Sequence, residues 1–197
     1  MKEKEPTTRR PITLDDINQI DYIDRYKKIE IVNGDWNEPD VPFYRSHGML
    51  SGVIQGTVIY LFGQYTREHN DLGVALAGSV GYVMEGTRDN IQLMRRTDVS
   101  FVRTEKLLST PKDEPIYAAP DIAIEVVYQD FADDMFQRID DFLSHGTEQV
   151  WVVAPSPKTI TVFLPGDIAR IYRPGQIIVL DDVLPGFKLD VAAVFEM

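Results

Sequence analysis

The chain has 197 residues, of which 44% are hydrophobic and 26% charged, a composition that supports one globular domain with a sizeable core. Cysteine is absent, which excludes disulfides, thiolate zinc sites and cysteine nucleophiles. The net charge of −11 opposes non-specific binding to a polyanion. The sequence shows neither an apolar run of about 18 residues nor a signal-peptide core, so we expect a cytoplasmic protein.

The N-terminal third predicts a tail, two helices and a hairpin. We expect residues 1–11 to form a flexible tail, and Thr13 to cap a short helix that follows it. A strand is predicted at 27–32, and the Asn-Gly pair at 33–34 predicts a tight turn after it. From 46 to 67, apolar residues recur on one helical face, which indicates the main packing helix.

The rest of the chain predicts strands interrupted by one helix. Strands are expected at 74–84, with bends at its glycines, and then at 96–102, 121–127, 150–153, 159–164, 168–172 and 176–180. The helix is expected at 133–145, where apolar residues follow a 3.6-residue period and Gly146 stands at the C-cap. No repeat or internal domain boundary is evident. This order predicts an α/β or α+β fold with a mixed central sheet flanked by helices.

Glu125 is the most informative single residue. It interrupts the apolar run at 121–127, which is typical of a strand covered on both faces. A buried carboxylate needs a cation, a hydrogen-bond network or a raised pKa, since an unpaired one costs several kcal/mol. The two interpretations are a strand end that reaches solvent and a metal-binding or acid/base carboxylate.

A second acid and an acidic surrounding favour a metal. Asp98 lies on the preceding long strand, so the side chains of Asp98 and Glu125 can point into one site. Residues 121–148 contain eight acidic residues and one arginine, a net charge of −7 that suits divalent cations. Mg²⁺ prefers hard oxygen ligands and keeps several waters, so two or three carboxylates suffice.

Five segments in order resemble one protein family. They are Thr97-Asp98, the strand 120–126, the helix segment from Arg138 to Gly146, the strand 150–155 and Leu-Pro-Gly-Phe at 184–187. Their order and spacing resemble a large bacterial family of restriction-endonuclease-like proteins, numerous in cyanobacteria, of the PD-(D/E)XK nuclease superfamily. The hairpin sequence from Glu30 to Gly34 is also similar to that family. The resemblance implies a single restriction-endonuclease-like domain over residues 12–197.

The resemblance also implies roles for particular residues. Asp98 and Glu125 correspond to the two acids that bind Mg²⁺ (or Mn²⁺), and Glu30 to an acid that completes or orients the metal shell. Arg138 stands where the family has its catalytic lysine. The implied function is a metal-dependent endonuclease that acts on DNA, with a homodimer expected by analogy.

Two departures leave other functions open. Arginine is never a proton donor or acceptor at working pH, and its planar fork differs from an ammonium. Arg138 has a second interpretation, a surface ion pair with Asp134 and Asp141 on its own helix. Tyr128 replaces a serine that usually follows the strand. A catalytically impaired binding protein on the same fold is therefore the second hypothesis, and an acid/base pair of Asp98 and Glu125 acting on an uncharged substrate is the third.

The remaining polar candidates are expected to be structural. We expect the histidines His47, His69 and His145 to lie at the surface, Asp121 to end a strand and Gln149 to start one. The arginines Arg95, Arg96 and Arg103 are candidates for phosphate contacts, but a solvated strand edge is the favoured interpretation.

Overall fold

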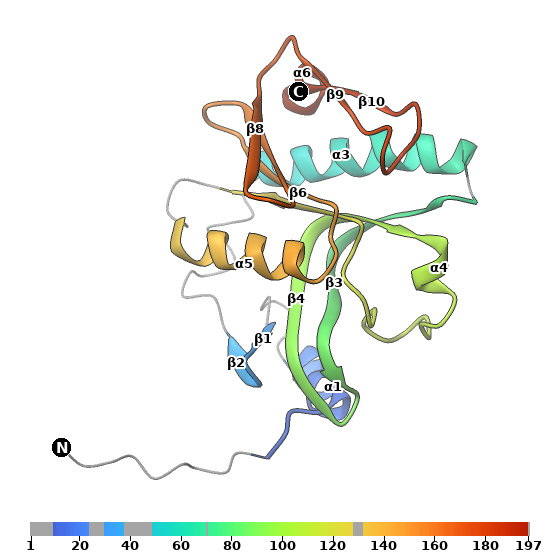
Figure 1. Cartoon of the computed structure of the whole chain (residues 1–197), viewed down its shortest axis with the longest axis vertical. Coiled ribbons are helices and arrows are strands. Elements are labelled where there is room, and N and C mark those ends of the chain that lie inside the picture. The colour runs from blue at the N-terminus through green and yellow to red at the C-terminus, as the bar shows by residue number, and fades with distance from the viewer. Residues whose placement is uncertain (1–9, 24–29, 38–48, 70, 128–131, 197) are drawn as a thin grey trace, which may run out of the picture.

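The computed structural model describes residues 10–23, 30–37, 49–69, 71–127 and 132–196 (Figure 1). Its helices are α1 (Leu14–Ile23), α3 (Met49–Glu68), α4 (Thr104–Leu107), α5 (Ala132–Ser144) and α6 (Val191–Phe195). Its strands are β1 (Glu30–Val32), β2 (Asp35–Asn37), β3 (Gly73–Thr87), β4 (Asn90–Arg103), β5 (Ile122–Val126), β6 (Gln149–Ala154), β7 (Thr159–Leu164), β8 (Ile168–Tyr172), β9 (Ile177–Val179) and β10 (Lys188–Asp190). In these described parts, no helix is long and apolar enough to cross a bilayer.

One mixed sheet organises these elements. Its strands follow the order β2-β1-β4-β5-β6-β7-β8, with β3 also paired to β4, while β9 and β10 form a separate two-stranded sheet. The pairing of β5 with β6 is parallel and the other pairings are antiparallel. The parallel pair needs a crossover connection, and α5 supplies it between the two strands.

Helices α3 and α5 cover opposite faces of the sheet (Figure 1). Ile54, Val58 and Phe62 of α3 pack in the main core with the even-numbered apolar residues of β5. On the other face, Ile139 and Phe142 of α5 pack against residues that include Ala123 and Val150. Because side chains alternate along a strand, Glu125 shares the α5 face with Ala123.

The structure bears out most of the predicted elements. The helix expected at 133–145 is α5, its C-terminal Gly146 has a φ of 94°, and the expected hairpin turn joins β1 to β2 with positive φ at residues 33 and 34. The bend expected in the third strand is a register shift in β3 after Ala77, where Gly78 has a φ of 71°. The tail at 1–9 and the predicted strand start at 27–29 lie outside the described residues.

Two predicted strands are too short, and three small elements were not predicted. Strands β3 and β4 extend well beyond 74–84 and 96–102 and form one long hairpin (Figure 1). The unpredicted elements, α4, β10 and α6, have three to five residues each. Segments of this length are too short to show a hydrophobic period. They are stabilised by contacts with residues distant in sequence; for example, the N–H of Thr104 in α4 donates to the carbonyl of Leu72.

Helix α1 begins with the cap predicted from the sequence. The N–H of Asp16 donates to the Thr13 hydroxyl at 3.3 Å, and Asp16 in turn accepts from the N–H of Thr13 at 2.9 Å, a reciprocal capping box. Arg10 donates two hydrogen bonds to the same carboxylate. These hydrogen bonds, from Arg10 first and Thr13 next, hold the pKa of Asp16 far below its ordinary value.

We expect Asp16→Asn to lower the free energy of unfolding at neutral pH but not in acid. The pKa of Asp16 is lower in the folded protein than in the unfolded chain, so ionised Asp16 stabilises the fold above its unfolded-state pKa, near 4. This stabilisation is lost as the pH falls through the folded-state pKa. Urea unfolding of both proteins from about pH 2 to pH 7 measures this. A difference that stays constant down to the lowest pH would contradict the assignment.

Candidate active site

Strands β4 and β5 bring the two predicted acids together. Their antiparallel register pairs Val99 with Ile124, which places Asp98 and Glu125 at the next facing position. Both side chains are almost fully buried, at 6% and 4% exposed. Asp98 Oδ2 accepts a hydrogen bond of 2.9 Å from the N–H of Val126, which fixes this carboxylate beside the strand that carries Glu125.

Arg138 reaches this point from α5. Its Nη2 donates to Glu125 Oε1 at 2.5 Å and to the carbonyl of Arg96 at 2.5 Å. Its Nη1 donates to Glu30 Oε2 at 2.5 Å. The guanidinium therefore ties together β1, β4 and β5 at one place.

Glu30 is the centre of the ion-pair cluster. It is fully buried, and Arg95 Nη1 donates to the same Oε2 atom at 2.8 Å. Its other oxygen accepts the N–H of Arg96 at 2.7 Å. Arg95 in turn pairs with Asp141 of α5 at 2.6 Å. The side chains thus alternate in sign from Asp141 through Arg95, Glu30 and Arg138 to Glu125.

Electrostatics keeps Arg138 charged. Burial would lower the pKa of its guanidinium, but the charges of Glu125 and Glu30, with the hydrogen bonds to both, raise that pKa well above its ordinary value. Arg138 is consequently a permanent cation and not a proton shuttle. With Asp98 included, the six side chains comprise four carboxylates and two guanidiniums, a net charge of −2.

The structure contradicts one of the two interpretations of Arg138. Its side chain is 6% exposed and contacts Glu30 and Glu125, so the interpretation as a surface ion pair is wrong. Helix α5 places Arg138 on the flank of its apolar face, one residue before Ile139, and the flank faces the end of β5.

Arg95 and Asp141 complete the cluster, and their roles were missed. The expectation of a solvated strand edge is wrong for Arg95, which is 1% exposed. The Arg95 guanidinium can be buried because it pairs with the carboxylates of Glu30 and Asp141. These partners lie 65 and 46 residues away in sequence, so the local sequence does not reveal them. The three-residue spacing of Arg138 and Asp141 on one helix was the available signal, because such residues lie on the same side of a helix.

The other candidates are placed as follows. Asp121 accepts the N–H of Arg103 and pairs with Arg103 and Lys106, so it ends its strand structurally, as predicted. Gln149 starts β6 and accepts from the Trp151 indole. His69 is exposed and stacks on Tyr65, whereas His145 is half-buried. His47, Tyr128 and the side chain of Asp134 lie outside the described residues.

A divalent cation fits part of this arrangement. Asp98 and Glu125 supply the hard oxygen donors that Mg²⁺ prefers, and a net charge of −2 is what such an ion offsets. Glu30 differs, because its two oxygens already accept three N–H groups. Within the described residues, no group of three or more acidic or histidine side chains is arranged to hold a metal ion. Glu30 is thus already engaged with N–H groups, and Asp98 and Glu125 are the two carboxylates that could hold a metal ion here.

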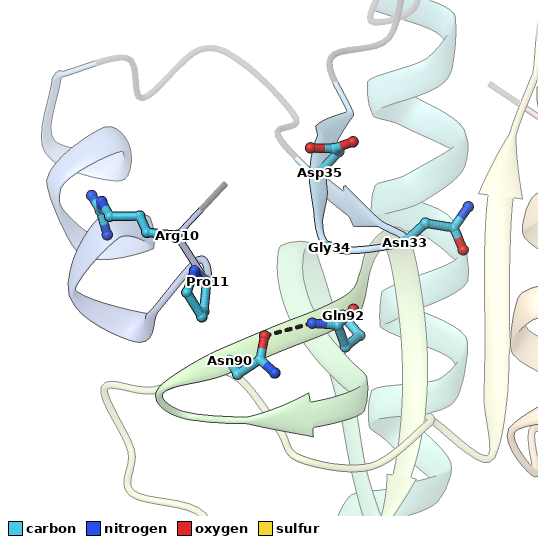
Figure 2. A pocket seen from close by; sticks show the side chains of 7 residues that line it. All are labelled: Arg10, Pro11, Asn33, Gly34, Asp35, Asn90 and Gln92. Atoms are coloured by element: carbon cyan, nitrogen blue, oxygen red, sulfur yellow. Dashed lines mark hydrogen bonds between the residues drawn. The ribbon is translucent and has the colours of Figure 1, made fainter. Parts of the chain in front are cut away.

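A separate polar pocket of about 430 Å³ lies at the tips of the two N-terminal hairpins (Figure 2). It is lined by Arg10, Pro11, Asn33, Gly34, Asp35, Asn90 and Gln92. In Figure 2 the amide of Gln92 points toward Asn90, to which it donates a hydrogen bond. No residue of the ion-pair cluster lines this pocket, so the two features are distinct.

A mixed sheet between helices, with buried acids on neighbouring strands and a cation from the crossover helix, defines a restriction-endonuclease-like fold. A solved structure described as "a putative nuclease belonging to DUF820" from Anabaena variabilis matches with a TM-score of 0.70 and 18% identity, over 94% of this chain and 98% of that chain. No curated protein matches the sequence. Residues 15–192 match the model of the Uma2 family, described as "Putative restriction endonuclease", and the chain belongs to that family.

Proposed function

We propose that this chain is a divalent-metal-dependent endonuclease that hydrolyses phosphodiester bonds in DNA. The observation that carries the proposal is the buried guanidinium of Arg138, held against Glu125 and beside the strand position of Asp98. A fixed cation next to two carboxylates provides both signs of charge that phosphoryl transfer requires. Membership of the Uma2 family supports the same reaction class.

Each member of the cluster has a role in this proposal. Asp98 and Glu125 would hold Mg²⁺ or Mn²⁺, which when bound supplies a water of lowered pKa and offsets charge on the phosphate. Arg138 would donate hydrogen bonds to the charge that develops on the phosphate, in place of the family's lysine. Glu30 would orient Arg138, and through Arg138 the carboxylate of Glu125, by the hydrogen bonds described above.

The substrate and the assembly are part of the proposal. Because the chain carries a net charge of −11, we expect weak affinity for DNA without a metal and a strong dependence on divalent cations. We also propose a homodimer, since two copies of the site could act on both strands of a duplex.

Cleavage of supercoiled and single-stranded DNA tests the reaction. We expect nicking with Mg²⁺ or Mn²⁺, none with a chelator, and a loss of about 100-fold or more for Glu125→Gln. Glu148→Gln is the matched control, because Glu148 pairs with Arg103 outside the cluster and its side chain is 37% exposed. Cleavage that survives Glu125→Gln unchanged would contradict the proposed site.

One observation favours a second function, a binding protein on the nuclease fold. Arg138 already donates to Glu30, Glu125 and the carbonyl of Arg96, so a phosphate must compete with three acceptors. In that case the wild-type chain binds a metal without cleaving DNA, and Arg138→Lys gains cleavage because lysine is the family's residue. A wild-type protein that nicks DNA excludes this second function.

A further inference from the structure

The polar pocket at the hairpin tips has the size of a small-ligand site. Its volume of about 430 Å³ lies within the range of about 300–1,000 Å³ that is usual for such sites. Three of its lining residues, Asn33, Asn90 and Gln92, carry amides, which both donate and accept hydrogen bonds. The pocket therefore suits a ligand with polar edges.

The backbone is specialised where the two hairpins meet at this pocket. Gly34 has a φ of 71°, and a Cβ atom there would lie 3.0 Å from Gln92 Oε1, so glycine lets the Gln92 side chain lie close against the turn. The Gly34 N–H also donates to the carbonyl of Gln92 at 2.9 Å. The register of β3 with β4 shifts at Gln92, which lies between the paired residues Ile91 and Leu93. Such irregularities turn a side chain in a new direction and are frequent beside functional sites.

Asn90 and Gln92 place a hydrogen-bond donor beside an acceptor. The Gln92 amide donates to Asn90 Oδ1, as the dashed line in Figure 2 marks. Within the described parts of the chain, the Asn90 amide N–H groups and Gln92 Oε1 accept or donate no other hydrogen bond. The complementary ligand edge has an N–H donor beside an acceptor nitrogen. Adenine and cytosine have such an edge, an exocyclic amino group next to a ring nitrogen.

The charges around the pocket favour a base over a phosphate. Arg10, which lines one wall, already donates two hydrogen bonds to Asp16. Asp35 adds a carboxylate to the lining. A carboxylate repels phosphate but accepts N–H groups from the amino group of a base.

The pocket lies on the same strands as the ion-pair cluster. On β4, Gln92 precedes Arg95 by three residues and Asp98 by six, which is about 10 and about 20 Å along a strand. On the other hairpin, Gly34 follows Glu30 by four residues. Stacked DNA advances about 3.4 Å per nucleotide, so a strand of about six nucleotides reaches from the pocket to Asp98.

We propose that this pocket binds an unpaired adenine or cytosine base of the DNA strand that reaches the candidate active site. Bound there, the base sets the position of cleavage relative to the sequence. The inference takes its DNA strand from the proposed function, but its test uses neither a metal ion nor cleavage.

A nuclear magnetic resonance titration with free nucleosides tests the pocket. We expect deoxyadenosine and deoxycytidine to shift the resonances of the Gly34 N–H and the Gln92 side-chain amide. Both should bind at least about fivefold more tightly than thymidine, the effect of a matched pair of hydrogen bonds. Equal affinity of the wild type for deoxyadenosine and thymidine would overturn the proposal.

A glutamine variant assigns the preference to the pocket. Gln92→Met keeps much of the side-chain volume but removes the acceptor, and we expect it to bind the three nucleosides equally weakly. Gln64→Met is the matched control, because Gln64 is exposed on α3 and does not line the pocket, and it should keep the wild-type preference. A preference that is unchanged in Gln92→Met would overturn the proposal.

A parallel DNA-cleavage assay separates this inference from the proposed function. A wild type that prefers deoxyadenosine to thymidine but never cleaves DNA supports the pocket and contradicts the proposed reaction. A wild type that cleaves DNA but shows no preference among the nucleosides contradicts the pocket alone.

Discussion

Glu30→Gln is expected to lower the free energy of unfolding by about 3–5 kcal/mol, the usual cost of removing one partner from a buried ion pair. Glu30 lies between two arginines whose side chains are 1% and 6% exposed. Without the carboxylate, Arg95 and Arg138 remain as buried like charges that share one neutral neighbour. Urea unfolding of both proteins at neutral pH measures the loss.

The control for this prediction is an exposed ion pair of the same chemistry. Glu148 pairs with Arg103, and the two side chains are 37% and 29% exposed. Its change to glutamine should cost no more than about 1 kcal/mol, because surface ion pairs contribute little. Equal losses for the two variants would mean that the cluster around Glu30 is no more important than a surface contact.

Arg138→Met is expected to lower the rate of metal-dependent DNA cleavage by about 100-fold or more, the effect of removing one preorganised donor from a reacting site. Methionine keeps much of the volume of the side chain but removes the charge and every N–H donor. Arg138→Lys restores a cation and should retain more activity than Arg138→Met. Initial rates on supercoiled DNA, measured well below the unfolding temperature of each variant, provide the comparison.

Arg88→Met serves as the matched control for Arg138→Met. Arg88 pairs with Glu114 at the surface, where its side chain is 59% exposed, so its loss should leave cleavage nearly unchanged. If Arg138→Met and Arg88→Met cleave DNA equally well, Arg138 has no part in the reaction.

Local pattern predicted the elements that carry the site. The apolar run around Glu125 predicted β5, and the period of α5 with its C-terminal glycine predicted the helix that carries Arg138. These signals are readable because each depends on residues close together in sequence. The placement of Asp98 on the preceding strand suggested its pairing with Glu125, and the resemblance to a nuclease family supported it. The register of β4 and β5 places these residues at facing positions.

The contacts inside the cluster were beyond sequence reasoning. Glu30 and Arg138 are 108 residues apart, and the sequence around either residue does not indicate that the two side chains are in contact. The burial of Arg95 follows from the same long-range contacts, so a strand arginine that reads as solvated is in fact enclosed. The small elements near the C-terminus were missed for a related reason, since tertiary contacts rather than periodicity hold them.

Binding of Mn²⁺, followed by electron paramagnetic resonance or calorimetry, tests the central claim most directly. We predict one Mn²⁺ per chain and a loss of affinity of about tenfold or more in Glu125→Gln and in Asp98→Asn, because each removes a carboxylate ligand. The Glu148→Gln protein should bind as the wild type does. Binding that is absent, or that is unchanged in both site variants, would contradict a metal centre at Asp98 and Glu125.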